Sequence, residues 1–274
     1  MKITKIMAAI VLTLVLGLAG CENGSSPSTS TGTMICFGDS LTEGYGASSP
    51  GVVDKTKSYP AVLQGKVTLR VVNAGKTGDT AAGGLARVDK DVISKNPQVV
   101  VILLGANDFM GLRSANETKA DLQGIMQKIN TNNRKIFLAS FIGDSGWEAA
   151  FIEALNLNPV LASSAKLLLN TYKTMFNELA SENKDVVYIP DIWAGEVWKH
   201  MSDQIHPNAD GYSIMANNIF NAMEPYLREN NYKRRIAPDE FEISTLVQGL
   251  FPGWKVPAKS PSLEIKSFVT MPSS

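Results

Sequence analysis

The chain has 274 residues, 44% of them apolar, and its 26 basic and 26 acidic residues give a formal net charge of zero. This length allows one domain of about 200 residues with additional segments. The balanced charge argues against a nucleic-acid partner, which would need a basic face. With only two cysteines and two histidines, neither a disulfide framework nor a transition-metal site is expected.

The first 20 residues have the pattern of an export signal. Lys2 and Lys5 precede an uncharged, mostly apolar run over residues 6–19, which is too short for a comfortable membrane span. The run ends in Leu-Ala-Gly-Cys21, which resembles the lipobox of bacterial lipoproteins. The resemblance implies cleavage before Cys21, lipidation of its thiol and an extracytoplasmic, membrane-anchored protein, in the outer membrane or at the cell surface if the cell is diderm. An ordinary secretory signal or a retained anchor remains the alternative.

Composition divides the rest of the chain into three parts. Residues 21–32 are rich in Ser, Thr and Gly and are predicted to be a flexible tether. Residues 33–232 carry the patterns of a folded domain. Residues 233–274 contain five prolines and no helical period. They form a C-terminal extension of unknown role, whose apolar residues predict that part of it packs on the domain.

Within residues 33–232, buried-strand patterns alternate with helical periodicity. The predicted strands cover residues 33–37, 67–73, 99–104, 136–141 and 186–189. Five helices are predicted. The first begins near Tyr59, and the second runs from an N-cap at Asp79 to Ser94. The third and fourth include Leu122–Ile129 and Leu168–Leu179, and the last includes Tyr212–Met223 and is limited or kinked near Pro225. This alternation predicts a five-stranded parallel sheet in a three-layer α/β/α domain.

A serine follows the first predicted strand. The apolar run ends at Gly38 and continues as Asp39-Ser40-Leu41, which places the Ser40 hydroxyl where open α/β sheets carry their sites. A second Gly-Asp-Ser at residues 143–145 follows the fourth predicted strand, and a plain polar turn is the alternative for both. Asp39 is interpreted as a hydrogen-bonding residue of the turn.

The second informative stretch is Asp203-Gln204-Ile205-His206-Pro207-Asn208. An aspartate three residues before a histidine can accept the ring's Nδ1–H, which leaves Nε2 to take a proton from a serine. We therefore expect Ser40, His206 and Asp203 to meet in space. The other histidine, His200, has no ligand-like neighbours and is interpreted as a surface or structural residue.

Four blocks, in order, resemble those of the GDSL, or SGNH, hydrolases. They are Ser40 in FGDSLTEGYG, Gly75 in VVNAGKTGDT, Asn107 in LLGANDF, and Asp203 with His206 in DQIHPN. The resemblance covers roughly residues 33–231 and is strongest to bacterial lysophospholipase/thioesterase-like arylesterases. It implies a flavodoxin-like SGNH-hydrolase fold and a serine esterase or lipase-type acyl hydrolase without metal or organic cofactor.

This resemblance also implies a role for each block. Ser40 would be the nucleophile, His206 the general base and Asp203 the residue that orients it. The backbone N–H groups of Ser40 and Gly75, with the side-chain amide of Asn107, would form the oxyanion hole. The expected substrates are small or lipid-like carboxylic esters, with thioesters and lysophospholipids included.

The substrate pocket is less constrained by the sequence. Phe109, Met110 and Leu112 are predicted to line an acyl pocket, with packing inside the loop as an equal interpretation. Residues 145–159, with Trp147 and Phe151, are predicted to be a lid or pocket wall. A carbohydrate O-deacetylase and a non-catalytic surface lipoprotein that binds glycan or lipid remain alternatives. No nucleic acid and no obligate protein partner is expected.

Overall fold

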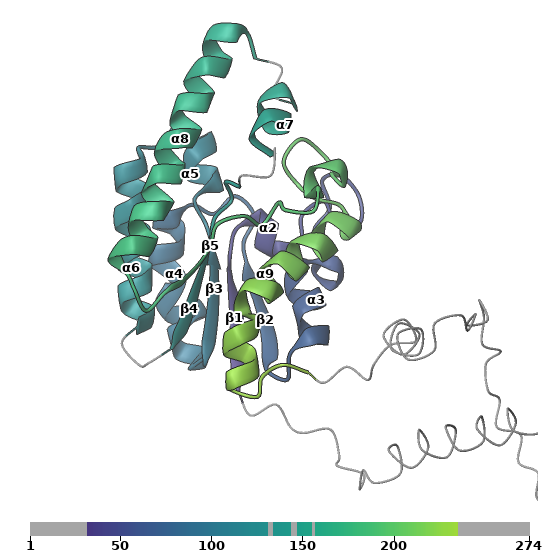
Figure 1. The fold of residues 1–274 in the computed structure, drawn as a ribbon, viewed down its shortest axis with the longest axis vertical. Coiled ribbons are helices and arrows are strands. Elements are labelled where there is room, and N and C mark those ends of the chain that lie inside the picture. Colours follow the sequence, from purple (N-terminus) through teal and green to yellow (C-terminus); the bar gives the residue numbers. More distant parts are fainter. Residues whose placement is uncertain (1–31, 131–133, 144–146, 155–156, 235–274) are drawn as a thin grey trace, which may run out of the picture. The chain divides into compact units, whose positions relative to one another are not determined.

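The computed structural model describes residues 32–130, 134–143, 147–154 and 157–234 (Figure 1). The predicted signal peptide, Cys21, the tether up to residue 31 and the extension beyond Arg234 lie outside the described residues, as does Ser145. Within the described ranges, no helix combines the length and the apolar character that crossing a membrane requires.

Five parallel strands form one sheet in the order β2-β1-β3-β4-β5. The strands are β1 (Thr33–Gly38), β2 (Arg70–Gly75), β3 (Val99–Leu103), β4 (Lys135–Ala139) and β5 (Val187–Ile189). This is the flavodoxin-like order, whose switch point lies between β1 and β3. The predicted α/β fold class is therefore confirmed.

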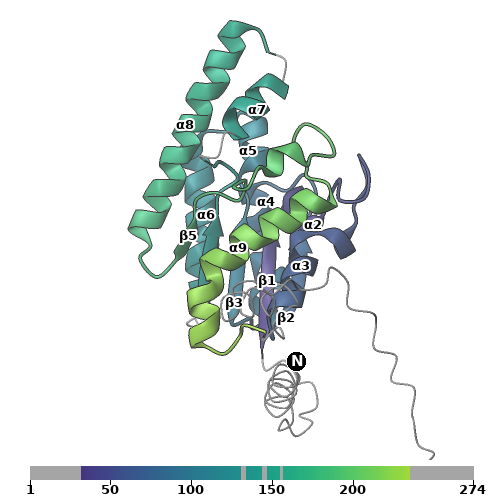
Figure 2. The same ribbon diagram turned by 45° about the vertical axis from the view of Figure 1, so that its right-hand side comes forward.

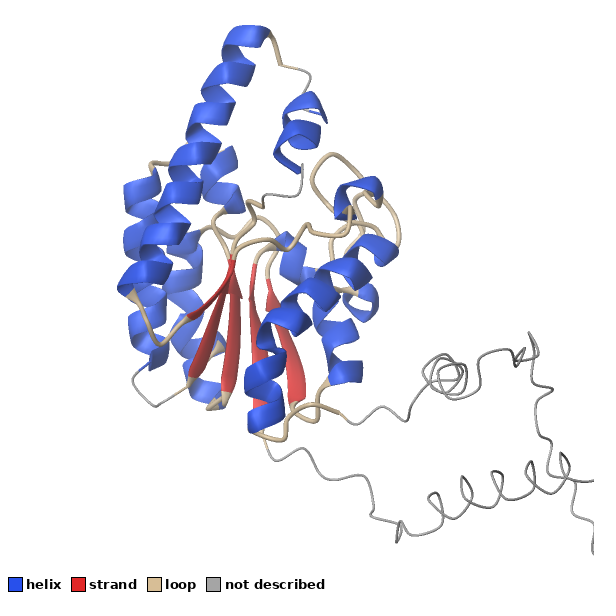
Figure 3. Ribbon diagram, in the orientation of Figure 1, coloured by secondary structure: helices blue, strands red, loops and turns tan. Residues whose placement is uncertain are grey.

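Helices cover both faces of the sheet (Figures 1, 2 and 3). On one face α4 (Ala81–Asp91) packs against α6 (Ala115–Asn130), which packs against α8 (Pro159–Glu182). On the other face α3 (Tyr59–Lys66) packs against α9 (Ala209–Glu229). The short elements are α2 (Ser40–Glu43), α5 (Ala106–Met110), α7 (Trp147–Ala154) and the 3-10 turns η1 (Lys55–Lys57), η2 (Ile93–Lys95) and η3 (Val197–Lys199).

The core lies along the central strands. Every residue of β3 is buried and apolar, and all of β1 after Thr33 is buried. Strands covered on both faces have such continuous apolar runs, which is why the sequence revealed them. At the carboxyl edge, Gly38 of β1 is paired with Gly75 of β2 and Leu103 of β3, so these three strands end level with one another.

Four predicted boundaries differ from the structure. The second strand begins at Arg70 and not at Val67, because the Val67 N–H closes helix α3 on Leu63 and Val67 forms an isolated bridge with Lys233. Helix α4 is capped by Thr80 and not by Asp79, because the Thr80 hydroxyl accepts the Gly83 N–H. Helix α4 itself ends at Asp91, before η2. Helix α9 does not end at Pro225 but continues to Glu229.

Candidate active site

Ser40 is the first residue of helix α2, at the carboxyl end of β1. Asp39 caps this helix, because its Oδ1 accepts the Leu41 N–H at 3.0 Å. Gly44, with φ 97°, ends the helix after a single turn. As the first helical residue, Ser40 has an N–H with no acceptor inside the helix. Its side chain lies at a sharp strand-to-helix turn and is only 7% exposed.

The structure brings Ser40, His206 and Asp203 together, as the sequence predicted. The Ser40 Oγ lies 2.9 Å from His206 Nε2. On the other side of the ring, Nδ1 lies 2.8 Å from Asp203 Oδ2 and 3.1 Å from Oδ1. His206 precedes α9 in a loop, and 166 residues separate it from Ser40 in the chain.

The backbone of its own loop holds the Asp203 carboxylate in position. Asp203 Oδ1 accepts the N–H groups of Ile205 at 2.9 Å and His206 at 2.8 Å. Partial burial alone would raise the pKa of the Asp203 carboxyl, but the hydrogen bonds from Ile205 and His206 outweigh it and hold the pKa below its ordinary value. Asp203 therefore stays ionised and is placed to accept the Nδ1–H of His206.

Tyr45 packs on the imidazole of His206, with ring centroids 4.5 Å apart. The Tyr212 hydroxyl of helix α9 holds this segment by donating to the carbonyl oxygen of Tyr45 at 2.8 Å. The ring of His206 is thus confined on one side by an aromatic ring and at both nitrogens by hydrogen bonds.

Asn107 lies in α5, directly after β3, and borders the same cavity as Ser40 and His206. Its Nδ2 donates to the carbonyl oxygen of Asp79 at 2.9 Å. A side-chain amide has two N–H groups, so one N–H of Asn107 remains for another acceptor.

The prediction for Gly75 is wrong. Its N–H is already used, because it donates to Asn73 Oδ1 at 2.9 Å. A Cβ at Gly75 would lie 2.2 Å from the backbone nitrogen of Glu43. The absence of a side chain at Gly75 therefore allows β2 to lie close to α2. Its N–H is not available to an oxyanion.

Gly78 is the residue that sequence reasoning missed. Among the described residues, none accepts a hydrogen bond from the Gly78 N–H, and Gly78 has φ 77°. Its neighbour Asp79 accepts the hydrogen bond from Asn107, so the free N–H lies one residue from that contact. The sequence signal was the glycine of Gly78-Asp79-Thr80, two residues before the cap of helix α4.

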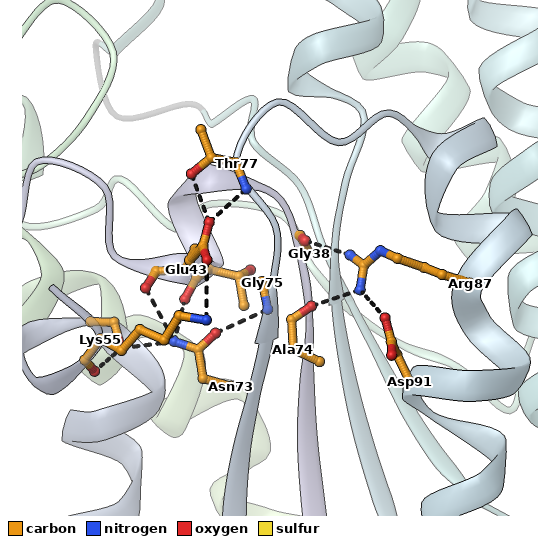
Figure 4. A network of polar contacts seen from close by, with 11 residues as sticks. Gly38, Glu43, Lys55, Asn73, Ala74, Gly75, Thr77, Arg87 and Asp91 are labelled. Atoms are coloured by element: carbon orange, nitrogen blue, oxygen red, sulfur yellow. Dashed lines mark hydrogen bonds and ion pairs between the residues drawn. The ribbon is translucent and has the colours of Figure 1, made fainter. Parts of the chain in front are cut away.

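Two charged side chains join the carboxyl ends of the strands (Figure 4). Arg87 of α4 donates to the carbonyl oxygens of Gly38 at 2.8 Å and Ala74 at 2.9 Å. It also donates to Asp79 Oδ2 at 2.6 Å. Glu43 of α2 accepts from both the N–H and the hydroxyl of Thr77. Neither role was predicted from the sequence, because both depend on contacts between distant elements.

Buried carboxyl groups lie beneath the turn of Ser40. Asp39 holds the turn, as predicted, but its Oδ2 is buried without a hydrogen-bond partner among the described residues. Burial is the main cause that raises the pKa of Asp39 to about 7. The negative charges of Asp79 and Asp108 raise it further, and the hydrogen bond from Leu41 lowers it. Asp108 accepts the Ala81 N–H at 2.8 Å. It thereby fixes the start of α4.

The cavity beside Ser40 has a mainly apolar wall. It is lined by Ser40, Leu41, Ala106, Asn107, Phe109, Met110, Phe141, Phe151, Trp193, Ile205 and His206. Phe109 and Met110, which were predicted to line an acyl pocket, both line this cavity. Leu112 does not, because it has φ 56° in the turn after α5 and its side chain is 79% exposed. Phe151 of α7 forms part of the wall, as predicted for residues 145–159.

The structure also bears on the metal site and on His200, both considered from the sequence. Within the described part of the chain, no three His, Cys, Asp or Glu side chains are grouped so that they could hold a metal ion. His200 is half-buried, and its carbonyl oxygen accepts the N–H of Asn208, the cap of helix α9. This contact assigns His200 a structural place.

Residues 36–214 match the sequence profile described as the GDSL-like Lipase/Acylhydrolase family. The chain is 25% identical over 202 residues to Esterase TesA of Pseudomonas aeruginosa, with 71% of this chain and 89% of the relative covered. It is 27% identical over 202 residues to Thioesterase 1/protease 1/lysophospholipase L1 of Escherichia coli, with 73% and 86% covered. The crystal structure of TesA superimposes with a TM-score of 0.56 at 25% identity and covers 70% of this chain and 98% of that one.

Proposed function

The chain belongs to the GDSL-like lipase/acylhydrolase family and is a carboxylic ester hydrolase of GDSL/SGNH type, and we propose that Ser40, His206 and Asp203 are its catalytic triad. The observation that carries the proposal is the continuous hydrogen-bonded chain from Ser40 Oγ through His206 to Asp203. A binding protein would not need a buried hydroxyl aligned on an imidazole whose other nitrogen faces a carboxylate.

The geometry supports an acyl-enzyme mechanism. Ser40 Oγ attacks the carbonyl carbon of the ester while His206 Nε2 takes its proton, and Asp203 stabilises the imidazolium. When the tetrahedral intermediate collapses, His206 gives this proton to the leaving alcohol or thiol, and the acyl group stays on Ser40. Water then loses a proton to His206 and attacks the acyl-enzyme. When this second intermediate collapses, His206 returns the proton to Ser40 Oγ, and the carboxylic acid is released.

The negative oxygen of each tetrahedral intermediate requires hydrogen-bond donors. We assign this role to the N–H of Ser40, the N–H of Gly78 and the second N–H of the Asn107 amide. Each of them remains without an acceptor among the described residues, and Asn107 and Ser40 border one cavity. Loss of one such donor typically costs on the order of 10²–10³ in kcat.

The proposed substrates are small or lipid-like carboxylic esters. The cavity wall of Phe109, Phe141 and Phe151 favours an apolar acyl group over a sugar. The name of the Escherichia coli relative includes thioesterase and lysophospholipase, so acyl thioesters and lysophospholipids are included in the proposed range.

The test compares wild type, Ser40→Ala and Ser145→Ala on p-nitrophenyl acetate and on longer acyl esters. Ser40→Ala should lower kcat/KM by about 10⁴-fold or more, because the covalent route is lost. Ser145→Ala, in the second Gly-Asp-Ser, should match wild type. Equal activity of wild type and Ser40→Ala would contradict the triad, and no turnover by any form would indicate a binding protein.

We also propose that the protein is anchored to a membrane through lipid on Cys21. The support is the sequence pattern alone: two lysines, a short apolar run, and Ala19-Gly20 before the cysteine. Metabolic labelling with an alkyne fatty acid should mark the wild-type protein but not Cys21→Ala, and the label should partition with membranes. Equal labelling of both would overturn this proposal.

A further inference from the structure

A turn at residues 76–79 carries the free N–H of Gly78 beside helix α2. The Asp79 N–H donates to the carbonyl oxygen of Lys76 at 3.1 Å, and the third residue, Gly78, has φ 77°, as in a type II turn. The Lys76 N–H donates to the carbonyl oxygen of Gly38 at 3.0 Å. One end of the turn is therefore bonded to the backbone that leads into Ser40.

Glu43, the last residue of α2, holds the middle of this turn (Figure 4). Its Oε2 accepts the N–H of Thr77 at 2.7 Å and the Thr77 hydroxyl at 2.8 Å. Thr77 directly precedes Gly78 in the chain. The same short helix thus begins with Ser40 and ends with the carboxylate that fixes the residue before Gly78.

Lys55 completes the arrangement on the outer side of Glu43. Its Nζ lies 3.1 Å from Glu43 Oε1, and the Glu43 side chain is only 18% exposed. Partial burial alone would raise the pKa of Glu43, but the hydrogen bonds from Thr77 and the ion pair with Lys55 outweigh it and lower the pKa. Glu43 is therefore ionised at neutral pH and can accept both hydrogen bonds at once.

We propose that Glu43 is a positioning residue, which fixes the N–H of Gly78 relative to Ser40 so that both N–H groups meet the same oxyanion. This inference rests on the proposed ester hydrolysis. Glu43 touches neither the substrate nor the reacting atoms and acts through Thr77. Donors aimed in advance at the developing charge are effective because they need no reorganisation during the reaction.

The first measurement is the kinetics of Glu43→Ala on p-nitrophenyl acetate. A displaced donor should lower kcat by about 10- to 100-fold, while KM changes by less than about threefold. Glu43→Gln keeps one acceptor oxygen and should lie between Glu43→Ala and wild type. Thr77→Val should lose part of the rate, and Thr77→Ser, which retains the hydroxyl donor, should recover it.

A second measurement separates positioning from a general loss of structure. A boronic acid forms a tetrahedral adduct with a nucleophilic serine and places an oxygen where the oxyanion develops. Its inhibition constant should rise in Glu43→Ala by roughly the factor lost in kcat/KM, after correction for the active fraction. Glu224→Ala is the matched control, because Glu224 of α9 also pairs with a lysine, Lys233 at 2.9 Å, and Lys233 forms an isolated bridge with Val67.

The outcomes distinguish this inference from the proposed function. If Ser40→Ala is inactive and Glu43→Ala has wild-type kcat and boronate inhibition, the role of Glu43 is overturned and the triad stands. If Glu43→Ala loses rate only through a smaller active fraction, the residue is a structural brace and the inference is again overturned. If wild type itself has no esterase activity, both proposals fail.

Discussion

Asp203 divides its two oxygens between the backbone and the imidazole. Oδ1 accepts the backbone N–H groups of Ile205 and His206 and lies 3.1 Å from His206 Nδ1, whereas Oδ2 is the oxygen nearer to Nδ1, at 2.8 Å. The backbone N–H groups can only be satisfied by an acceptor. They therefore dictate which atom of residue 203 is left to face the ring, and through it which tautomer His206 adopts.

This division predicts the effect of Asp203→Asn. The amide oxygen should take the two backbone N–H groups, and the NH₂ group should then face Nδ1 and leave the ring proton on Nε2. Because Nε2 then cannot accept the proton of Ser40, kcat should fall on the order of 10⁴-fold. Steady-state kinetics measure this loss, and an unchanged thermal unfolding midpoint serves as the control. A loss smaller than about tenfold would contradict the assignment.

Asp39 predicts a stability that depends on pH. Its pKa is about 7 in the folded protein, above the ordinary value of 3.8. As pH rises, Asp39 therefore loses its proton at a lower pH in the unfolded chain than in the folded protein. From about pH 4 to pH 7 the folded state binds more protons, and the contribution of Asp39 to the unfolding free energy falls as pH rises. Asp39→Asn keeps the acceptor for Leu41 and should remove this fall.

Urea unfolding of wild type and Asp39→Asn at pH 5 and pH 8 measures this effect. The exposed Asp89, paired with Lys128, provides the control variant Asp89→Asn, which should retain the wild-type pH dependence. If Asp39→Asn lost as much unfolding free energy as wild type between pH 5 and pH 8, Asp39 would not be the source of this pH dependence.

The glycines at 75 and 78 should respond differently to alanine. At Gly75 the added Cβ would lie 2.2 Å from backbone, so Gly75→Ala should destabilise the fold by about 2–3 kcal/mol or more. At Gly78 no atom lies within 4 Å of an added Cβ, and only the strain of a positive φ, about 1–2 kcal/mol, is expected. Chemical denaturation measures both, and equal losses would contradict this interpretation.

At the scale of elements, the buried strands could be predicted because their burial is recorded in continuous apolar runs. The start of β2 could not, because Val67 to Leu69 are as compatible with a strand as Val71 and Val72. Whether these residues join the strand depends on helix α3 and on Lys233, which is far away in the chain. The prediction that the Gly75 N–H is available as an oxyanion donor failed for a similar reason, since only the fold shows that this N–H donates to Asn73.

Helix α7 supplies one wall of the cavity and should limit the acyl chain. Phe151 packs on Phe109 with ring centroids 6.0 Å apart, and both line the cavity beside Ser40. Phe151→Ala should open this wall and raise the ratio of kcat/KM for hexanoyl over acetyl esters by about tenfold. Leu167→Ala, at a position 70% exposed on α8, is the control. An unchanged ratio would contradict this role of Phe151.

At the scale of the whole molecule, the strand order explains why the site residues converge. Ser40 follows β1, Gly78 follows β2 and Asn107 follows β3, and these strands are neighbours that end level. The parallel alternation in the sequence therefore predicted a common edge. The distances within the site were not predictable, because they depend on side-chain contacts such as those of Arg87 and Glu43.

The same topology predicts a gradient of stability across the sheet. The amides of β1 and β3 are paired on both sides and buried, whereas β5 is an edge strand paired only with β4. Hydrogen exchange should be slowest in β1 and β3 and faster in β5, because edge amides open without global unfolding. Equal protection of β5 and β3 would contradict this expectation.

Strand β1 runs from Thr33 to Gly38, and Ser40 follows directly after its carboxyl end (Figure 1). Anything joined ahead of Thr33, such as an affinity tag, a display scaffold or a solid support, is therefore attached at the end of β1 opposite Ser40 and the cavity that Ser40 borders. An enzyme immobilised in this way would keep Ser40 at the end of the strand away from the support.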